Sequence, residues 1–302
     1  MARVPSTFRS FTGLDVSEFD SVYKNVKLKV EEFEERRLSR ETRERDIGAG
    51  HPFKLSLKDR ILMLIMYYRL YISSNLVGFL FDLDHSNVLR DIRYLEPAIR
   101  GCGIPIPQKM YERANRASTL EEVEEYFPGF KAFIDATEQE IPRPKNRLKR
   151  KTHYSGKRKR HTVKTQLTVN SGGLILHKTK HARGRRHDYD IFKQNHPDLP
   201  DGVKPHVDLG YDGIKKDFPK LNAVIPFKRR GGRNKKGRKL SPKKRLFNKE
   251  LSKARVVVEH TISRLKKFNI FGNEFRNRLR HYDVMTDIIS GLVNLRITGT
   301  TI

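Results

Sequence analysis

The chain of 302 residues contains one cysteine, few acidic residues and no long apolar run. The single cysteine, Cys102, excludes an internal disulfide bond and a zinc site built from cysteines, and it fits a reducing compartment. The longest apolar run, residues 61–68, is far too short to cross a bilayer. We therefore expect a cytoplasmic protein with no membrane partner.

The shortage of acidic residues gives the chain a large positive charge. It has 63 Lys and Arg against 35 Asp and Glu, which is a formal net charge of +28. Residues 141–187 contain no acid and 16 basic residues, and residues 218–249 contain no acid and 13 basic residues. The first of these runs is interleaved with strand-like residues, so much of it should be folded. A folded surface without acids favours nucleic acid as the partner, because each neutralised phosphate releases counterions.

The N-terminal half reads as a set of helices. Residues 15–18 (Asp-Val-Ser-Glu) resemble a capping box that opens a helix, and a second helix is expected from residue 57 to about residue 71. A short helical stretch at 73–81 is followed by a turn at 82–84 and by a further amphipathic helix, which Pro97 should end or kink. Two short helices joined by a tight turn indicate a helix-turn-helix motif.

The second helix of such a motif places its start in the major groove of DNA. The outward positions that we expect to contact DNA there are Ser86, Asn87, Arg90 and Arg93. Arg and Asn side chains can read guanine and adenine edges. Ser86 and Asn87 could instead simply cap the helix, and this alternative stays open.

The C-terminal half shows a different pattern. Strands are expected at residues 131–137, 162–169, 174–179, 205–210 and 222–227, and helices at 187–192, 247–268 and 283–295. This order is typical of a ribonuclease-H-like fold, a mixed sheet with helices on both faces. The predicted fold class is therefore α/β, a ribonuclease-H-like mixed sheet flanked by helices and preceded by an all-α helix-turn-helix domain. We expect a helical region at 1–52, the helix-turn-helix domain at 53–127 and the sheet domain at 128–302.

Three carboxylates stand where that fold would bring them together. Asp135 ends the first strand, Asp208 ends a later strand that should lie beside it, and Glu259 lies in the long helix. Carboxylate oxygens are the ligands that Mg²⁺ prefers, and two such ions can hold the attacking and leaving oxygens of a phosphodiester. Each residue also has a simpler explanation: Asp135 could begin a turn, Asp208 could bond to the backbone of Gly210, and Glu259 could pair with Arg255. Their joint occurrence in the most basic half of the chain favours a metal site.

The long helix carries a further pattern around the glutamate. At about 100° per residue, Arg255, Glu259 and Lys266 lie within roughly 40° of one another on its surface. A salt bridge explains Arg255 with Glu259 but leaves Lys266 unexplained. A role facing phosphate groups accounts for all three.

Three other acids are weaker candidates. Asp212 fits the turn that leaves the later strand, and Glu138 is at most an auxiliary ligand because it is out of phase with Asp135 along the strand. Asp188, next to His187, is expected to cap a helix.

Four stretches resemble the DDE transposases of bacterial and archaeal insertion sequences that are related to the eukaryotic PIF/Harbinger type. They are 133–144 (FIDATEQEIPRP), 154–166 (YSGKRKRHTVKTQ), 208–213 (DLGYDG) and 258–266 (VEHTISRLK), and the likeness runs from about residue 53 onward. The resemblance implies a catalytic triad of Asp135, Asp208 and Glu259 that holds two Mg²⁺ ions, with Mn²⁺ able to substitute. Related enzymes carry a Tyr-Arg-Glu-Lys signature, and this chain has Ser252 where the tyrosine falls, so the tyrosine's supporting role is in doubt.

This reading predicts a nucleoid-associated transposase that binds the terminal inverted repeats of an insertion sequence and catalyses Mg²⁺-dependent cleavage and strand transfer. Arg255 and Lys266 would orient phosphates as part of the catalytic site. Its partner would be double-stranded DNA, both the element ends and the target, and it would act as a homodimer or higher oligomer. The basic run Lys157, Arg158, Lys159 and Arg160 is expected to contact DNA. Two alternatives remain, a non-catalytic DNA-binding regulator derived from a transposase and a hydrolytic RNase-H-like nuclease.

Overall fold

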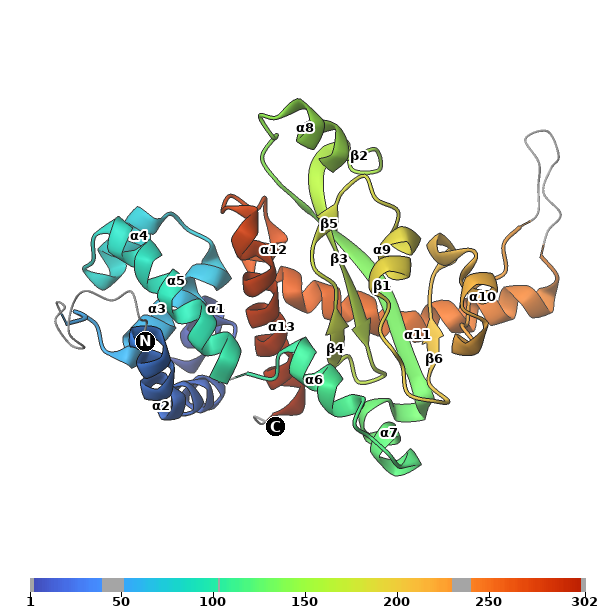
Figure 1. The fold of residues 1–302 in the computed structure, drawn as a ribbon, viewed down its shortest axis with the longest axis horizontal. Helices are drawn as coiled ribbons and strands as arrows, with labels where there is room; N and C mark the ends of the chain where they lie inside the picture. Colours follow the sequence, from blue (N-terminus) through green and yellow to red (C-terminus); the bar gives the residue numbers. More distant parts are fainter. Residues whose placement is uncertain (1–2, 40–51, 103, 230–239, 300–302) are drawn as a thin grey trace. The chain divides into compact units, whose positions relative to one another are not determined.

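The computed structural model describes residues 3–39, 52–102, 104–229 and 240–299 (Figure 1). The chain forms two compact units. The first contains residues up to Ile106 together with Leu265–Asn273 and Asn277–Ile302, and the second contains Pro107–Arg264 with Glu274–Arg276. Among the described helices, none is both long and apolar enough to cross a membrane.

The first unit is entirely helical. Its helices are α1 (Pro5–Thr12), α2 (Val16–Leu38), α3 (Leu57–Leu70), α4 (Ser74–Phe81), α5 (His85–Cys102), α12 (Asn269–Gly272) and α13 (Tyr282–Thr298), with a 3-10 turn, η4 (Leu279–His281). The capping box predicted for α2 is confirmed, since the Asp15 side chain accepts a hydrogen bond from the third helical residue and the Asp15 N–H donates to Glu18 at 2.6 Å. The tight turn between α4 and α5 gives the predicted helix-turn-helix order.

A buried ion pair joins α3 to α5. Arg60 donates to both carboxylate oxygens of Asp91, from Nε at 2.7 and 3.0 Å, and both side chains are nearly inaccessible to solvent. The ring of Phe53 covers the guanidinium with its centroid 3.5 Å away. Because removing one partner of such a pair leaves a buried charge, this contact fixes the face that α5 turns toward the core.

Of the two outcomes expected at Pro97, an end or a kink, the end does not occur: α5 continues to Cys102 with the proline inside it. The turn after the proline stays helical because Ala98 and Ile99 are fully buried and the same stretch packs against α13. Arg100 forms an ion pair with Asp287 of α13 at 2.9 Å. Tertiary packing thus outweighs the hydrogen bond that proline cannot make.

The second unit is built on a mixed six-stranded sheet. Its strands are β1 (Lys131–Glu140), β2 (Tyr154–Ser155), β3 (Arg160–Val169), β4 (Ile175–Lys178), β5 (Ala182–Arg183) and β6 (Lys204–His206). The central strand β1 pairs antiparallel with β3 and parallel with β6, while β4 pairs with the other edge of β3. The predicted strand at 222–227 is reduced to an isolated parallel bridge between Val224 and His206. This order matches the ribonuclease-H-like arrangement expected from the sequence.

Helices lie on both faces of this sheet. The second unit contains α6 (Pro107–Ala114), α7 (Leu120–Tyr126), α8 (Arg147–His153), α9 (Asp188–Asn195), α10 (Ile214–Asp217) and most of α11 (Pro242–Lys266), with 3-10 turns η1 (Pro128–Phe130), η2 (Leu209–Tyr211) and η3 (Pro219–Leu221). Asp135 of β1 contacts α11, whereas Lys164 of β3 contacts the start of α9. Neighbouring strand positions point to opposite faces, so α9 and α11 cover opposite sides of the sheet (Figure 1). The predicted α/β class is confirmed.

The compact units differ from the segments 1–52, 53–127 and 128–302 expected from the sequence. The last helix, α13, packs with α5 in the first unit, and the side chain of Asn294 donates to the Pro105 carbonyl at 2.9 Å. Helix α6 instead packs on β4 in the second unit. Hydrophobic periodicity identifies these helices, but it carries no information on which partner buries each apolar face.

Gly78 in α4 gives a direct test of the turn between α4 and α5. A Cβ at this position would stand 2.3 Å from the backbone oxygen of Leu83, so we expect Gly78→Ala to lower the free energy of unfolding by about 1–3 kcal/mol through overpacking. Urea denaturation would measure the change. Gly101→Ala in α5 is the matched control, because apart from its own helix backbone and chain neighbours no heavy atom of the described residues lies within 4 Å of the added Cβ. An equal loss in both variants would contradict the steric explanation.

Candidate active site

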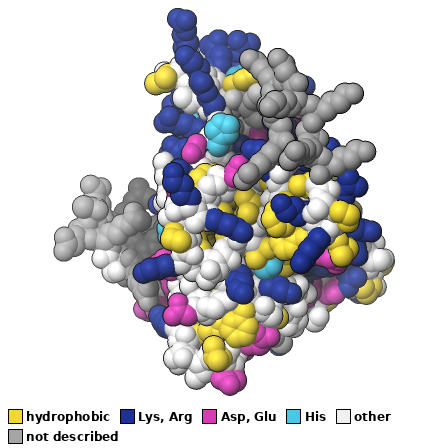
Figure 2. Space-filling view, turned by 90° about the vertical axis from the view of Figure 1, so that its right-hand side faces the viewer, with side chains coloured by type: hydrophobic (Ala, Val, Ile, Leu, Met, Phe, Trp, Pro, Cys, Tyr) yellow, Lys and Arg dark blue, Asp and Glu magenta, His cyan; other side chains and the backbone are white. Residues whose placement is uncertain are grey.

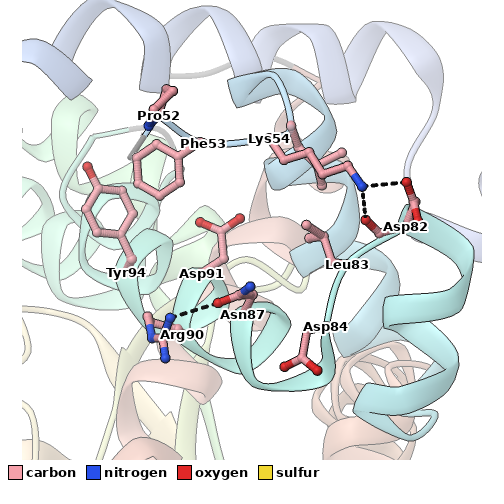
Figure 3. Close-up of a pocket in the computed structure, with 11 residues that line it drawn as sticks. Pro52, Phe53, Lys54, Asp82, Leu83, Asp84, Asn87, Arg90, Asp91 and Tyr94 are labelled. Carbon is pink, nitrogen blue, oxygen red and sulfur yellow. Dashed lines mark hydrogen bonds and ion pairs between the residues drawn. The ribbon is translucent and has the colours of Figure 1, made fainter. Parts of the chain in front are cut away.

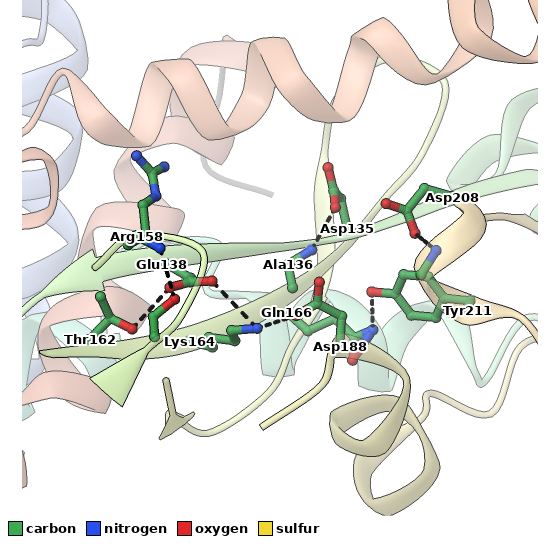
Figure 4. Close-up of polar contacts among 12 residues, drawn as sticks. Asp135, Ala136, Glu138, Arg158, Thr162, Lys164, Gln166, Asp188, Asp208 and Tyr211 are labelled. Carbon is green, nitrogen blue, oxygen red and sulfur yellow. Dashed lines mark hydrogen bonds and ion pairs between the residues drawn. The ribbon is translucent and has the colours of Figure 1, made fainter. Parts of the chain in front are cut away.

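Two carboxylates lie side by side where β6 ends. Phe133 of β1 is paired in parallel with His206 of β6, and Asp135 and Asp208 each follow two residues later. Asp208 lies just past the end of β6, but β1 continues to Glu140, so Asp135 lies in the middle of its strand and not at its end as the sequence predicted. Figure 4 shows the two carboxylates close together. The parallel register therefore brings together two of the residues predicted to bind metal.

Backbone donors fix the orientation of both carboxylates. The Gly210 N–H donates to Asp208 Oδ1 at 2.7 Å, and the Ala136 N–H donates to Asp135 Oδ1 at 2.8 Å. A Cβ on Gly210 would lie 2.8 Å from Asp208 Oδ1, so glycine is needed for this close approach. The bond from Gly210, considered above as a purely structural role for Asp208, thus coexists with the placement beside Asp135.

Asp135 is held in a crowded electrostatic environment. Its pKa is raised to about 6, mainly by burial and to a smaller extent by the charges of Asp208 and Asp188, while Arg255 and the Ala136 N–H oppose the rise. Arg255, from α11, has its Nη2 3.6 Å from Asp135 Oδ2, which is an ion pair at a distance too long for a good hydrogen bond. Its buried Nε has no hydrogen-bond partner within the described part of the chain. The site therefore has negative charge that is only partly balanced and a guanidinium that is only partly satisfied.

The other two predicted catalytic residues are placed differently. Glu259 is exposed, one turn after Arg255 on α11. In the described ranges, no three His, Cys, Asp or Glu side chains form a group that could hold a metal ion. Glu259 is therefore not in a shared ligand set with Asp135 and Asp208, and Lys266 belongs to the first compact unit.

The residues at this edge fit a divalent cation in part. Asp135 and Asp208 supply the oxygen donors that Mg²⁺ and Mn²⁺ prefer, and the raised pKa of Asp135 shows that added positive charge would be favourable there. A third ligand would have to come from the solvent-exposed part of α11, where Glu259 lies.

A buried lysine behind the carboxylates was not anticipated from the sequence. Lys164 of β3 forms ion pairs with Asp188 at 2.8 Å and with Glu138 at 3.4 Å, and Thr162 donates to Glu138 at 3.0 Å (Figure 4). The helix cap expected near Asp188 is not made by His187, which occupies the N-cap position without a side-chain hydrogen bond. Two features signalled this network: Asp188 is the first acid after the acid-free run, and Lys164 is the one charged residue in the buried stretch 162–169 of β3.

Asp135, Asp188 and Asp208 help to raise the pKa of a buried tyrosine, Tyr211. Tyr211 accepts a hydrogen bond from Gln166 Nε2 at 2.7 Å, and its pKa is raised well above the ordinary value by burial and by the charges of Asp135, Asp188 and Asp208. Its ring packs edge-on against Phe192 of α9. Tyr211 therefore stays neutral and anchors the turn that carries Asp208.

The start of α5 presents the residues predicted to contact DNA. Ser86, Asn87, Arg90 and Arg93 are all exposed. The Ser86 N–H donates to Asp84 Oδ1 at 2.8 Å, so Asp84 rather than Ser86 or Asn87 caps the helix. Arg90 Nη1 donates to Asn87 Oδ1 at 2.7 Å, and both residues border a cavity of about 660 Å³ beside α5 (Figure 3). The side-chain oxygen of Asn87 thereby holds the Arg90 guanidinium in a defined position. The side-chain NH₂ group of Asn87 is left to donate to another acceptor.

The turn between β2 and β3 contains Lys157, Arg158 and Lys159, and Arg160 is the first residue of β3. All four side chains are exposed. Lys159 has a left-handed backbone (φ 56°), and its N–H donates to the Ser155 carbonyl at 2.8 Å, which closes the turn. The hairpin follows directly on helix α8, and the two lie together at the top of the view (Figure 1). Helix α8 also carries several basic residues.

Comparison with known proteins gave matches for both units. Residues 134–294 match the family described as DDE superfamily endonuclease, and residues 53–103 match the family described as helix-turn-helix of DDE superfamily endonuclease. The chain is 32% identical over 251 residues to a protein of Microchaete diplosiphon described as "Probable transposase for insertion sequence element IS702", and the match covers 82% of this chain and 83% of the relative. No solved structure matches the chain.

The raised pKa of Asp135 predicts a pH dependence of stability in the metal-free protein. The unfolded chain releases this proton near the ordinary pKa of 3.8, whereas the folded protein keeps it up to about pH 6. The folded state binds more protons between these values, so its stability falls as pH rises through them, by up to about 3 kcal/mol from this group. Urea denaturation in EDTA at about pH 4 and about pH 6.5 would show this loss in wild type relative to Asp135→Asn. Parallel pH curves for the two proteins would contradict the prediction.

Lys164→Met should be strongly destabilising. The substitution leaves the largely buried carboxylates of Glu138 and Asp188 without their shared cation, and breaking a buried ion pair from one side costs about 3–5 kcal/mol. The free energy of unfolding from denaturant titration measures the effect. Lys180→Met removes an exposed lysine and is expected to change stability by no more than about 0.5 kcal/mol. A similarly small effect at Lys164 would show that its ion pairs are not important for stability.

Proposed function

The chain belongs to the DDE superfamily endonucleases, within their transposases, and from this premise we propose that it binds the terminal inverted repeats of an insertion sequence and catalyses both cleavage and strand transfer at its ends. The family membership predicted from the four sequence motifs is confirmed by the matches to both family domains and to the IS702 relative. The helix-turn-helix and endonuclease regions together imply DNA as the partner.

The observation that carries the proposal is the placement of Asp135 beside Asp208, each two residues beyond the parallel pair Phe133–His206. We propose that these two residues hold divalent metal, Mg²⁺ or Mn²⁺, with Glu259 of α11 as the third ligand. Two bound ions would activate the attacking oxygen and stabilise the leaving oxygen of the phosphodiester. The partly balanced charge around Asp135 supports this assignment.

Arg255 and Lys266 are proposed to orient phosphate groups. The support for Arg255 is its contact with Asp135 and the Nε that lacks a partner within the described residues, since a guanidinium binds phosphate oxygens through several parallel donors. Lys266 follows on the same helix. Arginine beside the carboxylates would also limit repulsion between the site and an incoming DNA strand.

DNA recognition is proposed to use two surfaces. Ser86, Asn87, Arg90 and Arg93 would lie toward the major groove, with the arginine that Asn87 orients as the strongest candidate for a base contact. The hairpin residues Lys157, Arg158, Lys159 and Arg160 would contact the phosphate backbone. Acting on two element ends would require a homodimer or a higher oligomer.

The two alternatives make different predictions. A non-catalytic regulator has no use for two adjacent carboxylates on a basic surface, because acids facing phosphate weaken DNA binding. A hydrolytic nuclease would cut DNA but would form no joined product. Incubating the protein with a labelled duplex carrying the inverted repeat, a supercoiled plasmid and Mg²⁺ separates all three cases.

We expect Asp135→Asn and Asp208→Asn each to reduce cleavage and joining by about 100-fold or more, because each removes a charged metal ligand from the transition state. Gel-shift affinity for the inverted repeat should be maintained. Asp212→Asn is the matched control, since Asp212 lies four residues beyond Asp208 but is exposed and paired with Lys228 at 3.1 Å. Undiminished cleavage by Asp135→Asn would overturn the metal assignment, and cleavage without joining would favour the hydrolase.

A further inference from the structure

Two phenylalanines form an exposed aromatic pair in the second unit. Phe227 and Phe247 keep 42% and 39% of their surface accessible, although their ring centroids are only 5.1 Å apart at an interplanar angle of 64°. The neighbouring Leu246 is 61% exposed. Contiguous exposed apolar side chains on a charged surface mark sites of interaction.

The position of Phe227 is fixed without help from its ring. The Phe227 N–H donates to Asn248 Oδ1 at 2.8 Å, and Asn248 Nδ2 donates back to the Phe227 carbonyl at 3.0 Å. These two hydrogen bonds to α11 already anchor the segment. The aromatic ring is therefore not needed to hold the chain, and its exposure calls for another explanation.

The aromatic pair is linked to the carboxylates through the same end of β6 and through the same helix, α11. Val224 bridges His206 in parallel, so Phe227, three residues further, and Asp208, two residues past His206, leave the sheet at the same edge. Along α11, Arg255 comes eight residues after Phe247 and contacts Asp135. At 1.5 Å per residue this is about 12 Å along the helix axis, close to the length of three or four stacked bases at about 3.4 Å each.

Basic side chains surround the pair. Lys244 Nζ lies 5.1 Å from the centroid of the Phe227 ring, and Lys228, Lys243 and Arg245 are exposed nearby in sequence. The adjacent acid Asp212 is paired with Lys228. Figure 2 faces the end of this unit that carries α10 and the start of α11, and it shows hydrophobic side chains lying among Lys and Arg. Aromatic rings within a basic surface are the combination that binds single-stranded nucleic acid.

We propose that Phe227 and Phe247 form a stacking platform for unpaired bases of the DNA strand that passes the active site. The proposal rests on the proposed function, because it assumes that DNA reaches Asp135 and Asp208. Paired bases present only their edges, so the platform would select a strand that has separated from its complement. On binding, Lys244 would leave the ring for a backbone phosphate. Stacking would be tolerant of sequence, since every base has a π-face.

The test uses the full chain in EDTA, so that no cleavage occurs, and a duplex with a short 3′ single-stranded extension containing 2-aminopurine. Binding should quench the 2-aminopurine fluorescence through stacking. Phe227→Leu and Phe247→Leu should each weaken affinity for the extended duplex by about tenfold and reduce the quenching, with affinity for the blunt duplex unchanged. Phe227→Tyr should retain both signals, and Leu246→Ala, which removes an exposed apolar side chain without a ring, should match wild type.

Unchanged quenching in both leucine variants would overturn the platform. An equal loss of affinity for blunt and extended duplexes would also overturn it, because the rings would then serve general binding. The outcome of this binding test does not depend on whether the protein cleaves or joins DNA. Quenching by a chain that neither cleaves nor joins DNA would support the platform and contradict the proposed function, whereas cleavage and joining without quenching would do the reverse.

Discussion

The parallel register between β1 and β6 is the constraint on which the rest of the site depends. It places two acids at the same edge of the sheet, in surroundings where a carboxylate loses much of its hydration. The consequences are visible around it: Asp135 has a raised pKa, Arg255 approaches from α11, and Lys164 neutralises a second pair of acids behind the strand. A sheet edge with this much negative charge is stable only when cations balance it, which is also what a metal-dependent phosphodiester enzyme requires.

Much of this arrangement could be predicted from sequence because it follows from local patterns. A capping box, strand alternation and the position of Asp208 just past a strand are encoded within a few residues. Asp135 lies in mid-strand instead, because β1 continues to Glu140 along its partner β3. Pro97 does not end α5, because the following turn is buried against α13, far away in the chain. The ion pairs of Lys164 were missed for a similar reason, since a strand sequence does not specify which helix covers it. The role of Glu259 as a metal ligand stays a proposal, because helix periodicity predicts which side of α11 the residue faces but not how far its side chain extends.

The distribution of acidic and basic residues in this molecule reflects function as well as solubility. In the catalytic unit, a backbone N–H donor holds Asp208 and a lysine holds Asp188. The hairpin at 157–160 presents only basic side chains. The proposed stacking of bases on Phe227 and Phe247 would add a contact that does not depend on charge. Binding through phosphates weakens with salt, whereas stacking is much less sensitive to it, so the two kinds of contact would discriminate between DNA structures under different conditions.

The last helix of the chain completes the core of the first unit. Ile288 and Leu292 of α13 are fully buried, and this helix packs on α5, the second helix of the helix-turn-helix. The ribosome synthesises α5 long before α13, with the whole endonuclease region between them. A chain released early would expose the face of α5 that α13 should cover and would be a substrate for proteolysis. Completion of the core of the first unit therefore has to wait until the whole endonuclease region has been synthesised.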